Sequence, residues 1–141
     1  MKMIKKILIY LILFFLIPIH SYALDLSKKY IFCHSLGFPE RSFGIFLKEN
    51  QNAEIYLIDD KTKKLIIFDT KLNYENSSLF QIVTNRVNST IAVIDKNINF
   101  YDTSIGTFLG GCVIMKNISM MKCKLEQTEQ VRAGEIPMVC N

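Results

Sequence analysis

The chain has 141 residues, of which 50% are hydrophobic, and a formal net charge of +4. Three of the 17 basic residues are Lys2, Lys5 and Lys6, and all 13 acidic residues lie after residue 23, so residues 24–141 hold 14 basic and 13 acidic residues. A nearly neutral domain with interspersed charges lacks the clustered lysine and arginine of a nucleic-acid-binding surface. We therefore exclude nucleic acid from the expected partners.

Residues 1–23 have the three parts of a secretory signal peptide. The lysines form a positive start, residues 7–17 are an unbroken apolar run, and Ser21-Tyr22-Ala23 places small residues at the two positions that a signal peptidase inspects. The run is interrupted at Pro18, short of the roughly 20 apolar residues of a membrane-spanning helix. This favours cleavage over a retained anchor, with the membrane contacted only transiently through the signal peptide.

Residues 24–141 are expected to form one exported domain, periplasmic or secreted, because their number is close to a common domain size. Apolar, β-branched and aromatic runs of five to nine residues recur along this part and predict strands. These runs are 29–34, 42–48, 54–59, 65–69, 79–84, 90–95, 98–102, 107–115 and 120–125.

Turn-forming clusters separate the predicted strands, and the shortest connects 90–95 to 98–102 as a hairpin. Residues 65–68 and 91–94 are apolar on both faces of a strand, which a sheet with one buried face would expose. The pattern predicts an all-β fold, a small antiparallel meander closing into a barrel or sandwich of about 8–9 strands. Residues 126–141 are predicted to be a polar tail tied back by a disulfide, and its first part, 126–134, is predicted to form a short helix or to stay loose.

All four cysteines, Cys33, Cys112, Cys123 and Cys140, lie in the expected exported part. An even number of cysteines in an oxidising compartment predicts a disulfide framework. Three pairings are open. The favoured one joins Cys112 to Cys123 across a hairpin, with residues 117–118 as its loop, and Cys33 to Cys140 as a clip between the first strand and the tail.

The sequence offers no strong catalytic or cofactor-binding constellation. His34 follows Cys33 directly, but neighbouring strand residues point to opposite faces, which disfavours a cysteine nucleophile with His34 as its base. In the C-x-x-C-H motif of covalent haem attachment, Tyr30 stands where the first cysteine is needed, so one of the two thioether links is impossible. Oxidised cysteines are no thiolate ligands for copper, so Met115, Met120 and Met121 are interpreted as packing residues. No catalytic residue, cofactor or metal is predicted.

The Tyr30-x-x-Cys33 spacing, the late Lys122-Cys123 pair, the size and the export segment are similar to small periplasmic β-barrel proteins such as the C-type lysozyme inhibitors. This resemblance covers cysteine placement and strand content, and it implies a barrel. The inhibitory loop of that family is rich in Ser, Ala and Tyr. The nearest stretch here, Tyr74-Glu75-Asn76-Ser77-Ser78, departs from that composition, so no functional residue is carried over.

The leading hypothesis is an exported, non-enzymatic binding or inhibitor-type protein. Its partner is expected to be a small apolar ligand, held in a hollow barrel, or an envelope protein. Two alternatives remain open at this point. One is an exported hydrolase that uses carboxylates such as Asp59 or Asp69 in an enclosed cleft, and the other is an envelope structural protein with a filled barrel and no ligand.

Overall fold

The computed structural model describes residues 5–6, 25–76 and 78–141. The expected signal peptide thus lies outside the described residues, apart from Lys5 and Lys6. Over the described part, nine strands form one antiparallel sheet, and a helix follows the last strand. The strands are β1 (Tyr30–His34), β2 (Phe43–Leu47), β3 (Asn52–Ile58), β4 (Leu65–Lys71), β5 (Asn73–Asn76), β6 (Leu79–Val83), β7 (Asn88–Ile94), β8 (Asn97–Asp102) and β9 (Phe108–Met115). A short 3-10 helix (Pro39–Arg41) connects β1 to β2, and the helix after β9 is α2 (Ile118–Arg132).

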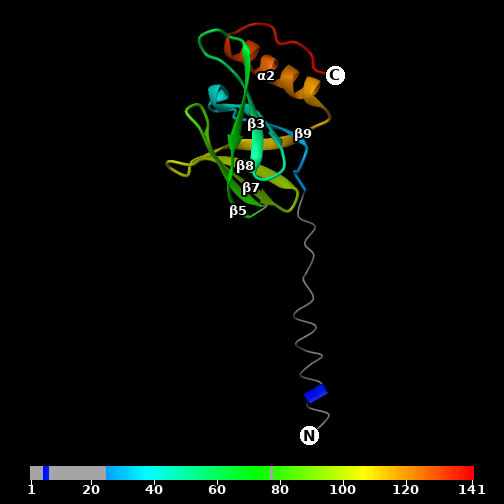
Figure 1. Cartoon of the computed structure of the whole chain (residues 1–141). Helices are drawn as coiled ribbons and strands as arrows, with labels where there is room; N and C mark the ends of the chain where they lie inside the picture. The colour runs from blue at the N-terminus through cyan, green and yellow to red at the C-terminus, as the bar shows by residue number, and fades with distance from the viewer. Residues whose placement is uncertain (1–4, 7–24, 77) are drawn as a thin grey trace.

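The sheet curls into a nearly closed barrel (Figure 1). Its strand order is β4-β3-β2-β1-β9-β8-β7-β6-β5, so strands consecutive in sequence are neighbours, except β4 and β5, and β1 pairs with β9. The two edge strands, β4 and β5, are separated in sequence by Leu72 alone, which is buried in the core. A sheet whose two edges are joined by one residue must curve round on itself. The expected all-β antiparallel meander closing into a barrel is confirmed.

Eight of the nine predicted strand regions are strands in the structure. The remaining observed strand lies outside all of the predicted regions. Asn73–Asn76, predicted as part of a turn, forms β5. The hairpin between β7 and β8 is confirmed, with Ile94 opposite Asn97 and a two-residue loop. The left-handed residue of that loop is Asp95 (φ 57°).

The barrel interior is filled by apolar side chains that point inward from the strands and pack against one another. Ile31, Ile45, Phe80, Ile91 and Phe100 have no exposed surface. Two aromatic rings meet edge to face inside the barrel, where the centroids of Phe43 and Phe100 lie 5.6 Å apart. Such packing is typical of a small barrel whose side chains occupy its interior.

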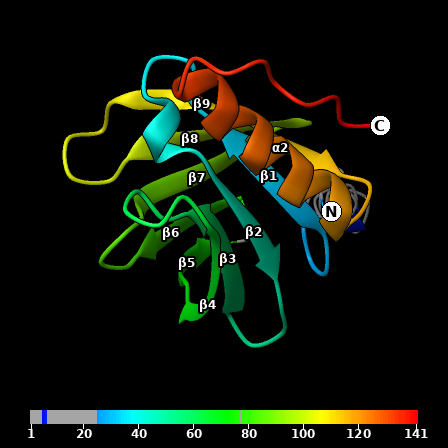
Figure 2. The same cartoon turned by 90° about the horizontal axis from the view of Figure 1, so that it is seen from above.

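A second apolar cluster lies on the outer face, between the sheet and α2. It consists of Phe32, Tyr56, Met121 and Leu125, with partly buried side chains around them. Alternate residues of β3 therefore pack in different layers. Ile55 packs in the barrel interior, and Tyr56 packs in the outer cluster. Figure 2 shows α2 lying across the sheet beside β1 and β2. Gly44 of β2 permits this close approach, because a Cβ there would lie 2.5 Å from the sulfur of Met121.

The predicted strand at 120–125 and the hairpin leading to it are wrong, because Ile118–Arg132 is helical. The side-chain oxygen of Asn117 accepts a hydrogen bond from the Met120 backbone N–H (2.9 Å), which caps the helix start. Ile118, Met121 and Leu125 then recur at helical spacing and face the sheet. The segment 126–132, predicted as the start of a tail, is the second half of this helix.

The disulfide pairing also differs from the favoured one. Cys33 pairs with Cys112 between β1 and β9, and Cys123 pairs with Cys140 between α2 and the C-terminal segment. A Cys112–Cys123 bridge required both residues to face each other in a hairpin, and the helix removes that geometry. The expectation that the tail is tied back by a disulfide agrees with the second bridge.

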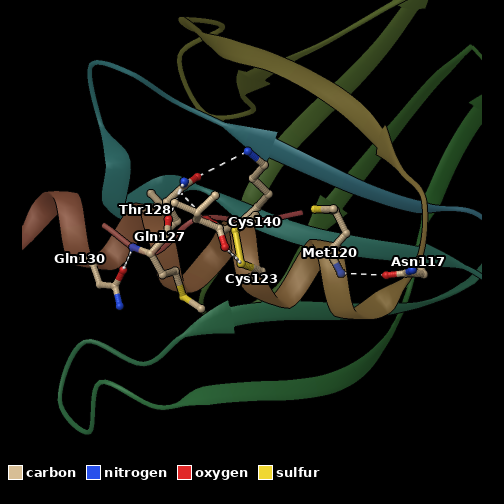
Figure 3. Close-up of a disulfide and its surroundings, with 10 residues drawn as sticks. Asn117, Met120, Cys123, Gln127, Thr128, Gln130 and Cys140 are labelled. Carbon is tan, nitrogen blue, oxygen red and sulfur yellow. Dashed lines mark hydrogen bonds between the residues drawn. A yellow bond between two sulfur atoms is a disulfide. The ribbon is translucent and has the colours of Figure 1, made fainter. Parts of the chain in front are cut away.

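The C-terminal segment runs back along α2 and is held by polar contacts as well as by the disulfide (Figure 3). The Gln127 side-chain amide donates to the Met138 carbonyl (3.0 Å), and the Met138 N–H donates to the Gln130 side-chain oxygen (2.6 Å). Gly134, with φ 74°, lets the chain reverse after the helix.

Candidate functional site

Four loops gather at one end of the barrel, which we call the loop end. They are residues 35–42, 59–64, 84–87 and 103–107, and they follow β1, β3, β6 and β8. These strands run toward the same end because each is antiparallel to its neighbours. The 35–42 and 103–107 loops are adjacent, since β1 pairs with β9, the strand that the second loop enters.

Two ion pairs link these loops across the mouth of the barrel. Arg41 donates a hydrogen bond to Asp102, the nearly buried residue at the end of β8. Arg86 donates to Asp59 (3.1 Å), joining the 84–87 and 59–64 loops. These guanidinium hydrogen bonds are the largest cause of the lowered pKa of each carboxyl. Both carboxylates therefore stay ionised and acceptor-only over an ordinary pH range.

A cavity of about 380 Å³ lies among the paired charges at the loop end. Its lining is largely polar, with Leu57 and Val87 among its few apolar residues. The polar lining includes Arg41, Ser42, Arg86, Ser89 and Asp102. Because both of its cations, Arg41 and Arg86, are already paired with carboxylates, this mouth offers neither an apolar chamber nor an unpaired cation for a ligand.

Hydrogen bonds from within the 35–42 loop support its conformation. The buried Ser35 donates its backbone N–H to the Ser42 hydroxyl oxygen, and its own hydroxyl oxygen accepts from the Phe38 N–H, both at 3.1 Å. Backbone bonds of the 3-10 turn, including Arg41 N–H to the Phe38 carbonyl (2.8 Å), complete it. The loop is therefore preorganised.

Large apolar side chains are exposed on the two adjacent loops and on Phe108, the first residue of β9. Leu36 is 87% exposed and Ile105 is 76% exposed, while Phe38 and Phe108 are about half exposed. The 103–107 loop is fixed in turn by its own bonds, since the Ser104 N–H donates to Asp102 (2.8 Å). We call Leu36, Phe38, Ile105 and Phe108 the apolar loop patch. Sequence reasoning missed it, although an apolar residue beside glycine within a turn cluster is a usable sign.

His34 lies on the outer face of β1, where its ring stacks near Phe32 (centroids 5.7 Å apart). Its Nδ1 is 3.4 Å from the Ser42 hydroxyl oxygen. Burial, and secondarily the positive charge of Lys124, lowers the pKa of His34. Cys33 points to the interior core instead, as strand alternation predicts, so the two residues form no nucleophile–base pair. Ser42 itself is nearly buried and accepts from Ser35, which makes it a loop support.

The two carboxylates considered for hydrolysis lie at opposite ends of the β3–β4 hairpin. Asp59 belongs to the loop end, whereas Asp69 pairs in register with Glu54, five residues earlier on β3. At about 3.3 Å per residue this separation is roughly 17 Å. Asp69 is exposed and accepts a hydrogen bond from Lys48 (2.9 Å), and Asp60, the neighbour of Asp59, accepts from Arg132 (2.8 Å). The structure does not bring Asp59 and Asp69 into one cleft.

The other residues singled out from the sequence have structural positions. All four cysteines are in disulfides. Met121 is packed beneath the helix, and the Met120 backbone takes part in the helix cap. Within residues 5–6, 25–76 and 78–141, no group of three or more His, Cys, Asp or Glu residues could hold a metal ion.

The fold and this end of the molecule define a small antiparallel β-barrel with two disulfides, a C-terminal helix on its outer face and an apolar loop patch at one mouth. Comparison with protein-family models, with curated proteins and with solved structures gave no match. No helix in the described part of the chain is long and apolar enough to cross a membrane.

Proposed function

We propose that this chain is an exported, non-enzymatic protein of the binding or inhibitor type that recognises a protein partner through the apolar loop patch. The observation that carries the proposal is the exposure of Leu36, Phe38 and Ile105 on two neighbouring loops and of Phe108 at the start of β9, directly after the second loop. Single exposed apolar residues are ordinary, but several of them on neighbouring loops are typical of an interaction site.

The rigidity of the loops supports this role. Binding by a flexible loop loses conformational entropy, which reduces the affinity gained from burying its apolar side chains. Here the Ser35 and Ser42 hydrogen bonds fix one loop, and the ion pair between Arg41 and Asp102 ties it to the other. The apolar side chains are thus displayed on a preorganised surface.

The filled interior favours a protein partner over a small apolar ligand. Inward-facing residues such as Ile55, Ile91 and Phe100 are fully buried against one another. The cavity at the mouth is lined mostly by polar and ion-paired groups. A small apolar ligand would need an open cavity lined mainly by apolar side chains.

The compartment belongs to the proposal as well. Disulfides persist in oxidising compartments, and the two bridges of this chain fit such a location. Together with the lysines and apolar run of residues 1–23, they support export to the periplasm or the outside of the cell.

The proposal is tested by site-specific photocrosslinking in the cells that produce this protein. A photoreactive residue at Phe38 samples the apolar loop patch, and one at Val113, which is exposed on the outer face of β9, is the matched control. We expect a discrete adduct with one protein at position 38 and none at position 113. No adduct at position 38, or the same adducts at both positions, contradicts the proposal.

A further inference from the structure

We propose that the free edge of β4 accepts an extended segment of another polypeptide as an added strand. This inference rests on the proposed protein-binding function. It adds to the apolar loop patch a second contact, which is made by backbone pairing along β4. In the described sheet β4 pairs with β3 alone, and the strand order ends at β4. Unpaired backbone donors and acceptors on an edge strand are completed by one chemistry, the backbone of another strand.

The β3–β4 register identifies which backbone groups are free. Opposite residues in an antiparallel pair alternate between exchanging hydrogen bonds and facing without them. The Asp59 N–H donates to the Lys64 carbonyl (2.9 Å), and the Leu72 N–H donates to the Gln51 carbonyl (2.8 Å). Even-numbered residues of β4 therefore direct their backbone groups to β3. The odd-numbered residues, Leu65, Ile67, Asp69 and Lys71, direct theirs to the free edge, where the Lys71 carbonyl already accepts from the Thr70 hydroxyl (3.4 Å).

The inner face of β4 is less completely buried than that of its neighbour. Ile66 and Phe68 point toward the interior and pack against the core, yet each remains partly exposed. Their partners across the ladder, Leu57 and Ile55, are buried. The difference arises because β4 has no strand on its other side. An added strand with apolar side chains on its inner face would cover Ile66 and Phe68.

The first half of this edge lacks the usual protection against strand addition. Natural edge strands are blunted by proline, by charges or by bulges. Residues 65–68 are Leu, Ile, Ile and Phe, and β4 pairs with β3 without a register shift. The charged residues, Asp69 and Lys71, are confined to the second half of the strand.

The side-chain order disfavours a second copy of this chain as the occupant. Two copies related by a two-fold axis pair their β4 edges antiparallel. In the register that uses all four free-edge residues, Leu65 lies opposite Lys71 and Ile67 lies opposite Asp69. The partly buried Leu65 and the exposed Ile67 then each face a charge. A different polypeptide with alternating apolar residues has no such mismatch.

The test selects a display library of random short peptides on the purified, oxidised protein. We expect enriched peptides to bind the wild type and to slow hydrogen exchange of the Leu65, Ile67 and Asp69 amides by about tenfold or more. Ile67→Pro removes one free-edge N–H without touching the bonds to β3, and it is expected to weaken binding at least about tenfold. Ile67→Val keeps that N–H and should bind like the wild type.

Three results overturn the inference. One is the absence of any enriched peptide that depends on the Ile67 N–H, and another is protection of the odd-numbered β4 amides in the free monomer. The third is concentration-dependent dimerisation that Ile67→Pro abolishes, which would make the occupant a second copy. The photocrosslink at Phe38 is measured in the same Ile67→Pro variant, so the proposed function succeeds or fails separately from the strand addition.

Discussion

Cys33 on β1 and Cys112 on β9 lie directly opposite each other and are joined by a disulfide, which links the first and last strands of the sheet. The same β1–β9 pairing joins the β1–β4 part of the sheet to the β5–β9 part. The bridge also closes a long loop, because the two cysteines are 79 residues apart. It therefore holds together contacts that are among the most distant in sequence, and its effect on stability is expected to be large.

Replacing both Cys33 and Cys112 by alanine should lower the free energy of unfolding by about 4–5 kcal/mol in the chain-entropy description of a loop this long. The Cys123–Cys140 bridge spans 17 residues, and the same description gives about 3 kcal/mol. Its measured loss should be smaller still, because the exposed tail gains freedom in the folded state once the bridge is absent. Urea unfolding of the two double-alanine variants measures the difference. An equal or larger loss for Cys123→Ala/Cys140→Ala would show that the tail bridge is the more important one.

Gly110 of β9 should not tolerate a side chain. A Cβ at this position would lie 2.1 Å from the His34 carbonyl oxygen of β1 and 3.2 Å from the Phe100 ring. The backbone oxygen cannot move aside without disturbing the β1–β9 pairing, so Gly110→Ala should destabilise by about 1–3 kcal/mol or more. Gly111 is the matched control, because the nearest atom to its added Cβ is 3.8 Å away. Thermal unfolding that gives equal shifts for the two variants contradicts this account.

The β meander follows from local patterning that the sequence displays. On β3, Ile55 and Leu57 alternate with Tyr56 and Ile58, and both sets are apolar because the interior lies on one side and α2 on the other. This two-layer arrangement was foreseeable in outline from the apolar residues on both faces. Elsewhere the second face is exposed, as at Ile94 and Ile67, so double apolarity alone does not indicate which strands are covered.

Neither the helix nor the disulfide pairing was predicted. Both errors have one cause, which is that the helical pattern after Asn117 was not recognised. Residues 119–127 contain no β-branched residue, and Asn117 stands at the capping position three residues before Met120. Only Ile118, Met121 and Leu125 mark the buried face, which is a short apolar stripe on an otherwise polar helix. Once 118–132 is helical, Cys123 leaves the sheet. Cys112 then pairs with the residue opposite it on β1.

The site was less predictable than the fold because it depends on distant loops meeting. No spacing in the sequence indicates that Arg41 reaches Asp102, sixty-one residues later. That contact follows from the β1–β9 pairing, which places the two loops side by side. The exposure of Leu36 and Ile105 likewise follows from the position of their loops beyond the barrel end.

The Arg41–Asp102 pair should give the loop end a defined acid sensitivity. Arg41 lowers the pKa of Asp102 in the folded state, so the pair stabilises the fold above the ordinary aspartate pKa of about 4. This contribution is lost as the pH falls through the lower folded-state pKa. Arg41→Met should reduce the free energy of unfolding at about pH 7 more than at about pH 2. Asp102→Asn is the control, because Arg41→Met added to it should produce little further pH dependence.

His34 should titrate below the ordinary histidine value of about 6.5, because burial and then Lys124 disfavour its charged form. The unfolded chain thus binds the proton more readily, and stability falls as the pH drops below about 6.5 toward the folded-state pKa. Lys124→Gln should raise the pKa of His34 part of the way and make this loss shallower, since the larger cause, burial, remains. An NMR titration of the His34 ring protons measures the pKa directly. Lys122→Gln, a charge change on the same helix but absent from the causes of the shift, should leave the titration unchanged. A His34 pKa at or above the ordinary value, or equal shifts in both variants, would contradict the packing of α2 against β1.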